Sequence, residues 1–127
     1  MAFTLTHLGK DQDGIVLVSS AGDATSFDFP SDHHWHFDTL LGTGWNSHLV
    51  LLDMDQTAYL ESSAIGWLIS CQKQFRQGGG RLVIHSVQPH IRNMLDMLKI
   101  DRVVPIAASA SAGRKILLSL AAMEQTA

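Results

Sequence analysis

The sequence predicts an α/β domain built on a mixed sheet of four or five strands with about four helices. Three short apolar runs, at residues 49–53, 81–85 and 103–106, are typical of buried strands, and each precedes a segment with helical spacing of apolar residues. Strands that alternate with helices become parallel neighbours joined by right-handed crossovers. Residues 3–6 and 15–18 favour a hairpin at the start of the chain, which adds antiparallel pairing to the sheet.

The composition predicts a single globular domain that spans residues 1–127. A chain of 127 residues can bury one core, and 46% hydrophobic with 17% charged residues is ordinary for a globular protein. The net charge of −3 argues against a nucleic-acid-binding surface. Cys71 is the single cysteine and cannot form an internal disulfide, which suits a reducing cytoplasm. No basic leader precedes an apolar core, and no apolar run approaches the ~20 residues that cross a bilayer, so we expect neither a signal peptide nor membrane insertion.

The N-terminal third begins with the two hairpin strands. Residues 3–6 alternate apolar and polar side chains, residues 10–14 have turn composition, and residues 15–18 form an apolar run. Residues 23–30 favour irregular structure. The Ser31-Asp32 pair predicts the start of a short helix, which carries Trp35, Leu40 and Leu41 and ends at Gly42 or Gly44.

A cluster of histidines lies in and before this short helix. Asp32, His33, His34 and His36 are close together, and Asp32 and His36 share a helical face. A protein metal site needs three or four ligands in suitable geometry, and neither H-E-x-x-H nor paired cysteines are present. We therefore expect no tightly bound metal at this cluster.

The middle of the chain predicts a strand, a loop and a long helix. Residues 49–53 form the strand, residues 53–59 the loop, and residues 62–77 the helix, whose C-terminus and following turn fall at the three glycines of residues 78–80. We expect Trp67 to lie partly exposed at the edge of the apolar face. That face consists of Ala64, Ile65, Leu68, Ile69, Cys71 and Phe75, and the opposite side carries Gly66, Ser70 and Lys73.

The C-terminal third predicts a strand at residues 81–85, a helix at residues 89–98, a short strand at residues 103–106 and a last helix. Pro89 suits the first turn of a helix, and Pro105 favours an edge strand or a strand end. The inward residues that the spacing predicts are Ile91, Met94, Leu95 and Leu98 in the first helix, and Ala112, Ile116, Leu120 and Met123 in the last, which Ser109 or Ser111 caps.

A polar corner with two adjacent hydroxyls separates the strand at residues 49–53 from the long helix. Its sequence is Glu61-Ser62-Ser63-Ala64-Ile65-Gly66. The first backbone N–H groups of a helix have no partner and the helix dipole is positive there, so serine is a good cap and a phosphate is well received. The serines therefore have two interpretations, a plain helix cap and a phosphorylation switch.

Catalytic and cofactor-binding patterns are absent from the sequence. Neither serine lies in a G-x-S-x-G motif, and Cys71 lies on an apolar helix face, where a thiol is inert. Asp53 and Asp55 follow a predicted strand, where α/β sheets often bind ligands, but two acids in a solvated loop form no catalytic set. We expect the protein to be no enzyme and to hold no cofactor.

The order of elements from residue 49 to residue 106 resembles the STAS domain of bacterial anti-sigma factor antagonists. The family pattern is an apolar strand ending in Asp, a loop, and Asp-Ser-Ser-Gly-Leu-Gly at the start of a helix. A Gly-Gly pair before a strand, a helix that begins with Pro, and a last short strand follow. This chain carries the pattern at residues 49–53, 61–66, 79–83, 89–98 and 100–104. It departs from the pattern at Glu61, where the family has Asp, and at Ala64, where it has Gly.

The resemblance implies a binding switch. In the family's regulatory systems the anti-sigma factor is a serine kinase that phosphorylates the serine directly after the motif's Asp, here Ser62. The unphosphorylated antagonist binds the anti-sigma factor and frees the sigma factor, and a serine phosphatase resets the cycle. The partner-binding residues that the resemblance implies are Glu61, Ser62, Ser63, Ala64, Gly66 and Trp67.

The resemblance leaves a second assembly open. STAS domains also occur as subunits of lipid-transport ABC systems and of stress-sensing complexes. Such a subunit docks on its partner without phosphorylation. The two interpretations differ in whether Ser62 receives a phosphate.

Overall fold

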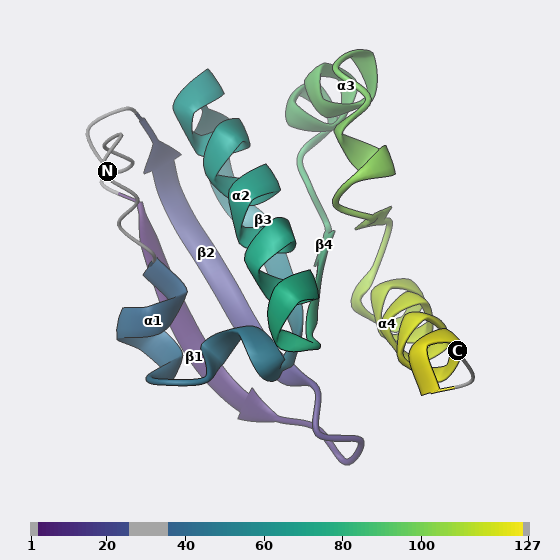
Figure 1. Cartoon of the computed structure of the whole chain (residues 1–127). Helices are drawn as coiled ribbons and strands as arrows, with labels where there is room; N and C mark the ends of the chain where they lie inside the picture. The colour runs from purple at the N-terminus through teal and green to yellow at the C-terminus, as the bar shows by residue number, and fades with distance from the viewer. Residues whose placement is uncertain (1–2, 26–35, 126–127) are drawn as a thin grey trace.

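The computed structural model describes residues 3–25 and 36–125 of the chain. A five-stranded sheet in the order β1-β2-β3-β4-β5 forms its centre (Figure 1). The strands are β1 (Thr4–Lys10), β2 (Val16–Ala24), β3 (Leu49–Leu60), β4 (Arg81–His85) and β5 (Ile106–Ala107). The first pair is antiparallel and the other three pairs are parallel, so the predicted mixed sheet is confirmed.

Four helices connect or follow the strands. They are α1 (His36–Leu41), α2 (Ser62–Gly78), α3 (Pro89–Met97) and α4 (Ala110–Gln125), with 3-10 turns η1 (Trp45–Ser47) and η2 (Ile100–Arg102). The predicted long helix, the strand at residues 81–85 and the proline-initiated helix lie where the periodicity placed them. The helix α2 ends as the glycines predict, because Gly79 at its C-cap is left-handed with φ 89°.

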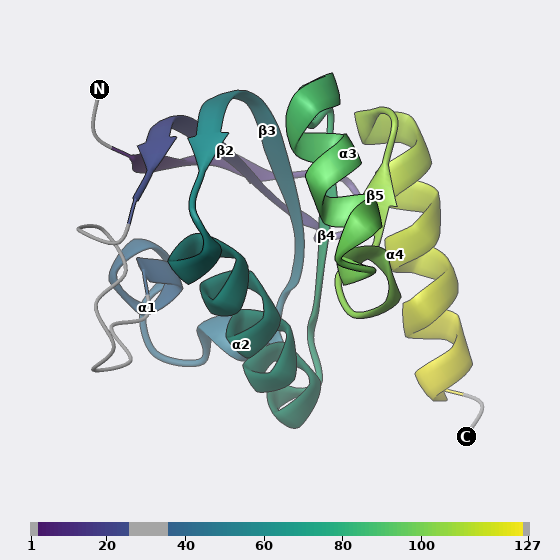
Figure 2. The same cartoon turned by 90° about the horizontal axis from the view of Figure 1, so that it is seen from above.

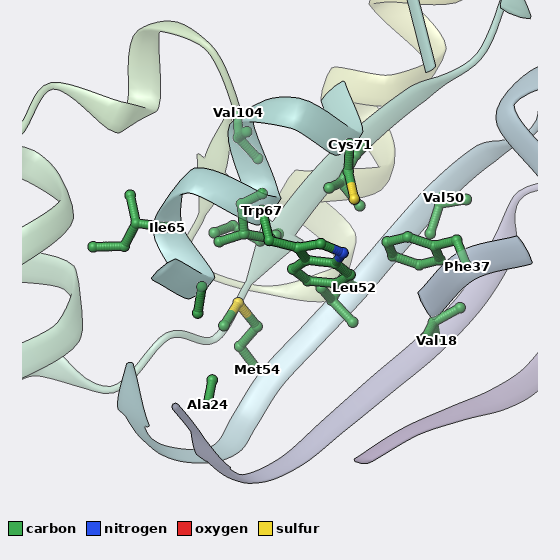
Figure 3. Close-up of a cluster of buried hydrophobic side chains, with 14 of the residues drawn as sticks. Val18, Ala24, Phe37, Val50, Leu52, Met54, Ile65, Trp67, Cys71 and Val104 are labelled. Atoms are coloured by element: carbon green, nitrogen blue, oxygen red, sulfur yellow. The ribbon is translucent and has the colours of Figure 1, made fainter. Parts of the chain in front are cut away.

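Two apolar clusters pack on opposite faces of the sheet. Alternate residues of β3 divide between them: Val50 and Leu52 belong to the larger cluster, and Leu51 to the smaller. Buried residues of α1, α2 and α3 belong to the larger cluster, and Leu117 of α4 belongs to the smaller. Figure 2 shows α1 and α2 together on one side of the sheet and α4 apart from them. Ala64, Ile65 and Trp67 at the start of α2 belong to the larger cluster, part of which is drawn in Figure 3.

The predicted loop at residues 53–59 is wrong, because β3 continues to Leu60. Its pairing with β2 extends from Ala21 opposite Gln56 to Ala24 opposite Leu60. The hydroxyls of Ser20 and Thr57 also form a buried hydrogen bond of 2.6 Å between these two strands. Pairing with a distant strand therefore overrides the polar local sequence.

The last strand is also displaced from its predicted position. Residues 103–104 follow η2 in a turn, and β5 consists of Ile106 and Ala107 alone. Val104 is fully buried without belonging to a strand. An apolar run that fills the core need not be a strand, and this one is a core loop.

Three expectations for side-chain burial are wrong. Trp67 is 8% exposed, whereas the spacing placed it partly in solvent. Leu98 is 55% exposed and Met123 is 64% exposed, whereas both were predicted to face inward. Helix α4 packs through buried Leu117 with partly buried Ala112 and Ile116, as predicted for the last two, and a Cβ atom on Gly113 would lie 2.6 Å from Leu51 Cδ1, so the helix approaches the sheet closely there.

The histidine cluster lies largely outside the described residues. Asp32, His33 and His34 belong to that part, and His36 is the first residue of α1. The His36 ring contacts Phe3 and Trp67 edge-on, with ring centroids 6.2 and 5.5 Å apart. The absence of a metal at this cluster stays a prediction.

Candidate functional site

The corner between β3 and α2 is fixed by backbone hydrogen bonds on both sides. Glu61 donates its N–H to the carbonyl of Ala24 at 2.8 Å, which ends the pairing of β3 with β2. The Glu61 carbonyl accepts from the N–H groups of Ala64 and Ile65 at 3.0 and 3.2 Å, which begins the helix. The change from extended to helical backbone is therefore completed within one residue.

Glu61 is the N-cap of α2, so the expectation of a serine cap is wrong. Its backbone is extended, with φ −82° and ψ 165°, and no side-chain capping bond is formed. The reason is the continued pairing of β3 with β2, which keeps the chain extended until Glu61. Ser62 and Ser63 consequently occupy the first two helical positions, where their N–H groups have no acceptor within the helix.

The two serines have different surroundings. Ser62 is exposed. The Oγ of Ser63 is buried and has no hydrogen-bond partner among the described residues. The structure thus separates two adjacent hydroxyls into one that an incoming protein can reach and one that it cannot.

The remaining predicted partner-binding residues also divide into two groups. Gly66 is exposed one turn after Ser62, so these two share a face of α2. Ala64 is fully buried, and Trp67 stacks on Phe37 with ring centroids 5.5 Å apart and planes inclined by 6° (Figure 3). Ala64 and Trp67 therefore support the surface from below, whereas Ser62 and Gly66 form it.

An exposed aromatic residue beside the corner was missed by sequence reasoning. Tyr59 lies three residues before Ser62 on the extension of β3 and is 50% exposed. In the structure, buried Thr57 and Leu60 bracket two exposed residues, and Tyr59 is one of them. The prediction of a loop there concealed it. Tyrosine is enriched at protein–protein interfaces.

The acids at the end of the parallel strands have local structural roles. A carboxylate oxygen of Asp53 accepts the backbone N–H of Asp55 at 2.9 Å. His85 lies opposite Asp53 in the sheet, is buried, and contacts the Ser86 hydroxyl through Nδ1 at 2.8 Å. Burial lowers the pKa of His85, an effect that nearby Asp53 and Asp55 oppose. The side chains of Asp53 and His85 therefore have hydrogen-bond partners within this end of the sheet.

Three further results concern metal sites, the cysteine thiol and membrane-spanning helices. Within residues 3–25 and 36–125, no group of three or more His, Cys, Asp or Glu side chains is arranged to hold a metal ion. Burial raises the pKa of the Cys71 thiol well above its ordinary value, so it is not a thiolate at neutral pH. Among the described helices none has the length and apolar character needed to traverse a bilayer.

Comparison with protein families matches most of the chain to one family model. The model of the STAS domain matches residues 10–112. BtrV of Bordetella bronchiseptica, described as an anti-sigma factor antagonist, is 30% identical over 63 residues, which are 50% of this chain. The match spans only about half, 54%, of the length of BtrV. The anti-sigma F factor antagonist of Paenibacillus polymyxa is 24% identical over 99 residues, covering 73% of this chain and 78% of that protein.

Solved structures share the same fold. The crystal structure of an anti-sigma factor antagonist from Thermotoga maritima superposes with a TM-score of 0.71 at 19% identity, over 91% of this chain and 93% of that one. An anti-sigma factor antagonist from Mycobacterium paratuberculosis superposes with a TM-score of 0.69 at 16% identity, over 90% and 94%. At such identities the likeness concerns the fold alone.

Proposed function

We propose that this chain, which belongs to the STAS domain family, is an anti-sigma factor antagonist whose binding to a serine-kinase anti-sigma factor is controlled by phosphorylation of Ser62. The names of its relatives in Bordetella and Paenibacillus support the first part of the proposal. The second part rests on one observation: Ser62 is exposed at the start of α2, whereas the hydroxyl of adjacent Ser63 is buried. A kinase needs access to the hydroxyl that it modifies, and of the two only Ser62 gives it.

The position of Ser62 suits a phosphate without loss of the fold. A phosphoserine adds about −1.5 to −2 charges and three acceptor oxygens. At the first helical position, these oxygens meet the positive end of the dipole of a 17-residue helix and N–H groups that lack helical acceptors. The charge of Glu61 opposes the phosphate. The folded protein therefore tolerates the modification, and its effect falls on whatever docks at the corner.

The surface around Ser62 suits a close protein contact. Exposed Gly66 leaves the second turn of α2 without a side chain, so another chain can approach the helix backbone there. Tyr59 supplies an exposed aromatic side chain close by. A phosphate on Ser62 would place charge within this contact and weaken it.

The proposed role is binding, without catalysis by this chain. The kinase belongs to the partner, and a serine phosphatase removes the phosphate and restores the binding form. We place this cycle in the cytoplasm, where sigma factors act.

The proposal is tested with three variants, each incubated with ATP and the serine-kinase anti-sigma factors of the source organism. Ser62→Ala is expected to receive no phosphate and to leave the partner permanently bound. Ser62→Asp is expected to bind the partner at least tenfold more weakly, which is a loss of about 1.4 kcal/mol. Ser63→Ala is the matched control and should be phosphorylated like the wild type. Intact-protein mass and calorimetric affinity are the measurements.

Two outcomes contradict the proposal in different ways. Phosphate on Ser63 moves the site by one residue and requires the start of α2 to open. No phosphate on either serine, with partner binding indifferent to Ser62→Asp, removes the switch and favours an unphosphorylated STAS subunit of a lipid-transport or stress-sensing assembly.

A further inference from the structure

The second half of β3, which leads to Ser62, has a strand neighbour on one side only. β3 pairs with β4 only from Leu49 to Asp53, but it pairs with β2 as far as Leu60. Residues 54–60 therefore have strand pairing on one side alone. Unpaired backbone groups along such an edge are open to water or to a foreign strand and allow the segment to shift.

Two side chains at the start of α3, one from its N-cap and one from its first turn, bind this edge. Gln88 donates from Nε2 to the carbonyl of Asp55 at 3.0 Å. His90 contacts the carbonyl of Ala58 through Nε2 at 2.8 Å, and because a carbonyl can only accept, this nitrogen carries the proton. Gln88 is the N-cap of α3 and Pro89 its first residue, so both donors come from a rigid segment.

Helix α3 is itself anchored to the core. Ile91 and Leu95 are essentially fully buried in the larger apolar cluster. The imidazole of His90 is therefore held by a fixed element, although it lies at the surface. It connects that element to Ala58, four residues before Ser62.

The corner is consequently held from two sides. From β2, the carbonyl of Ala24 accepts the N–H of Glu61. From α3, His90 holds the carbonyl of Ala58. The two exposed groups of the site lie next to these attachments. Tyr59 lies between Ala58 and Glu61, and Ser62 directly follows Glu61.

We propose that His90 is a positioning residue for Ser62: its bond to Ala58 fixes the β3–α2 corner in the orientation that the partner recognises. The inference rests on the proposed function, because it concerns how the same corner is presented to the kinase. A corner that is fixed before docking loses less conformational entropy on binding, so removal of this bond weakens recognition without any loss of direct contact.

Three variants test the hydrogen bond between His90 and the carbonyl of Ala58. His90→Ala removes the donor. His90→Gln supplies an amide N–H donor on a flexible side chain, as Gln88 already does for Asp55. Asn93→Ala is the matched control, because Asn93 is also exposed on α3 and its side chain makes none of the side-chain hydrogen bonds found among the described residues.

The first measurement is amide hydrogen exchange of Glu61, whose N–H is bonded to Ala24. In His90→Ala its exchange should accelerate about fivefold, which corresponds to the loss of one ordinary hydrogen bond. The rate should be unchanged in Asn93→Ala and close to the wild-type rate in His90→Gln. Unchanged exchange in His90→Ala overturns the claim that His90 holds the corner.

The second measurement is the kinetics of Ser62 phosphorylation by the serine-kinase anti-sigma factor. His90→Ala should raise KM about fivefold with kcat little changed, and His90→Gln should restore KM. A wild-type KM in His90→Ala overturns the inference while the proposed function stands. If the wild type itself receives no phosphate, the proposed function fails and this inference with it, and the exchange measurement still reports separately whether His90 holds the corner.

Discussion

At the scale of single residues, a buried glutamine replaces a missing strand neighbour. β5 pairs with β4 only at Ile84 and His85, so Leu82 has no partner strand on that side. Gln72 of α2 fills the place: its amide oxygen accepts the Leu82 N–H at 2.8 Å, and its amide nitrogen donates to the carbonyls of Leu82 and Val103, each at 3.0 Å. A polar residue on the inner face of α2 is thus explained by the short β5.

Replacement of Gln72 tests this role. Gln72→Leu would leave buried backbone groups of Leu82 and Val103 without partners, and each such group costs about 1–3 kcal/mol. We expect the free energy of unfolding, measured in urea, to fall by about 2–4 kcal/mol. Gln77→Leu, at an exposed position of the same helix, is the control and should change it little. A loss below about 0.5 kcal/mol for Gln72→Leu would contradict the role.

The buried histidine at the end of β4 makes stability depend on pH. Because burial lowers the pKa of His85 below 6.5, the unfolded chain binds a proton at pH values where the folded protein does not. The stability contributed by neutral His85 is present above pH 6.5 and is lost as the pH falls towards the folded-state pKa. His48, whose pKa burial and the nearby Lys10 and His7 also lower, acts in the same direction.

Urea unfolding at pH 7.5, 6.5 and 5.5 measures this dependence, with pH values chosen around the ordinary histidine pKa. The free energy of unfolding of the wild type should fall across the series, and His85→Gln should flatten the fall even if it lowers stability at every pH. His48→Gln measures the second contribution. If the free energy of unfolding of His85→Gln falls with pH as steeply as that of the wild type, other groups cause the pH dependence.

At the scale of elements, the turn between α2 and β4 fits closely against η1 and the residue that follows it. Gly80 donates its N–H to the carbonyl of Asn46 at 3.0 Å, and Arg81 donates to the carbonyl of His48 at 3.2 Å. A Cβ atom at Gly80 would overlap the carbonyl oxygen of His48 and lie 2.6 Å from that of Asn46. This contact fixes the end of α2 against the beginning of β3.

Two alanine substitutions at glycines should therefore have opposite effects. Gly80→Ala forces backbone apart and should destabilise the protein by about 2–4 kcal/mol, as overpacking against backbone does. Gly66→Ala meets nothing within 4 Å and should stabilise α2 by up to about 1 kcal/mol. Thermal and urea unfolding measure both. Similar stability changes in the two variants would show that the close approach at Gly80 is relieved by small movements.

At the scale of the whole molecule, one arginine connects the first turn of the chain to the last helix. Arg114 of α4 contacts Asp11 from Nε at 2.8 Å and also pairs with Asp13, although Asp11 and Arg114 are 103 residues apart. Asp11 also accepts the backbone N–H groups of Asp13 and Ile15 at 2.8 and 3.0 Å, so the ion pair is built onto an ordered turn.

Removal of this connection should have a modest effect that depends on salt. The Arg114 side chain is 31% exposed and that of Asp11 is 17% exposed, so solvent screens the pair only in part. Arg114→Met should lower the free energy of unfolding by about 1 kcal/mol at low salt and by less in 1 M salt. Lys115→Met, at the exposed neighbouring position, is the control. Equal effects of the two substitutions would remove any special role of the pair.

Sequence reasoning predicts the α/β class, the mixed sheet, the extents of α2 and β4, and the corner at which the proposed function lies. These features depend on local periodicity and on a short motif, both of which are visible along the chain. The polar insertion at Glu61, Ser62 and Ser63 between an apolar strand and an apolar helix is the local signal on which the proposed site rests.

Which hydroxyl is exposed, and what holds the corner in place, depends on contacts between distant parts of the chain. β3 extends to Leu60 because β2, more than 30 residues earlier, continues to pair with it. That pairing makes Glu61 the cap, places Ser62 outside, and leaves the edge that His90 binds. The burial of Trp67 likewise depends on the rings of Phe3, His36 and Phe37, which lie outside α2. Local periodicity records how apolar each face of an element is, but the neighbour that covers a face or pairs with an edge comes from a distant part of the chain.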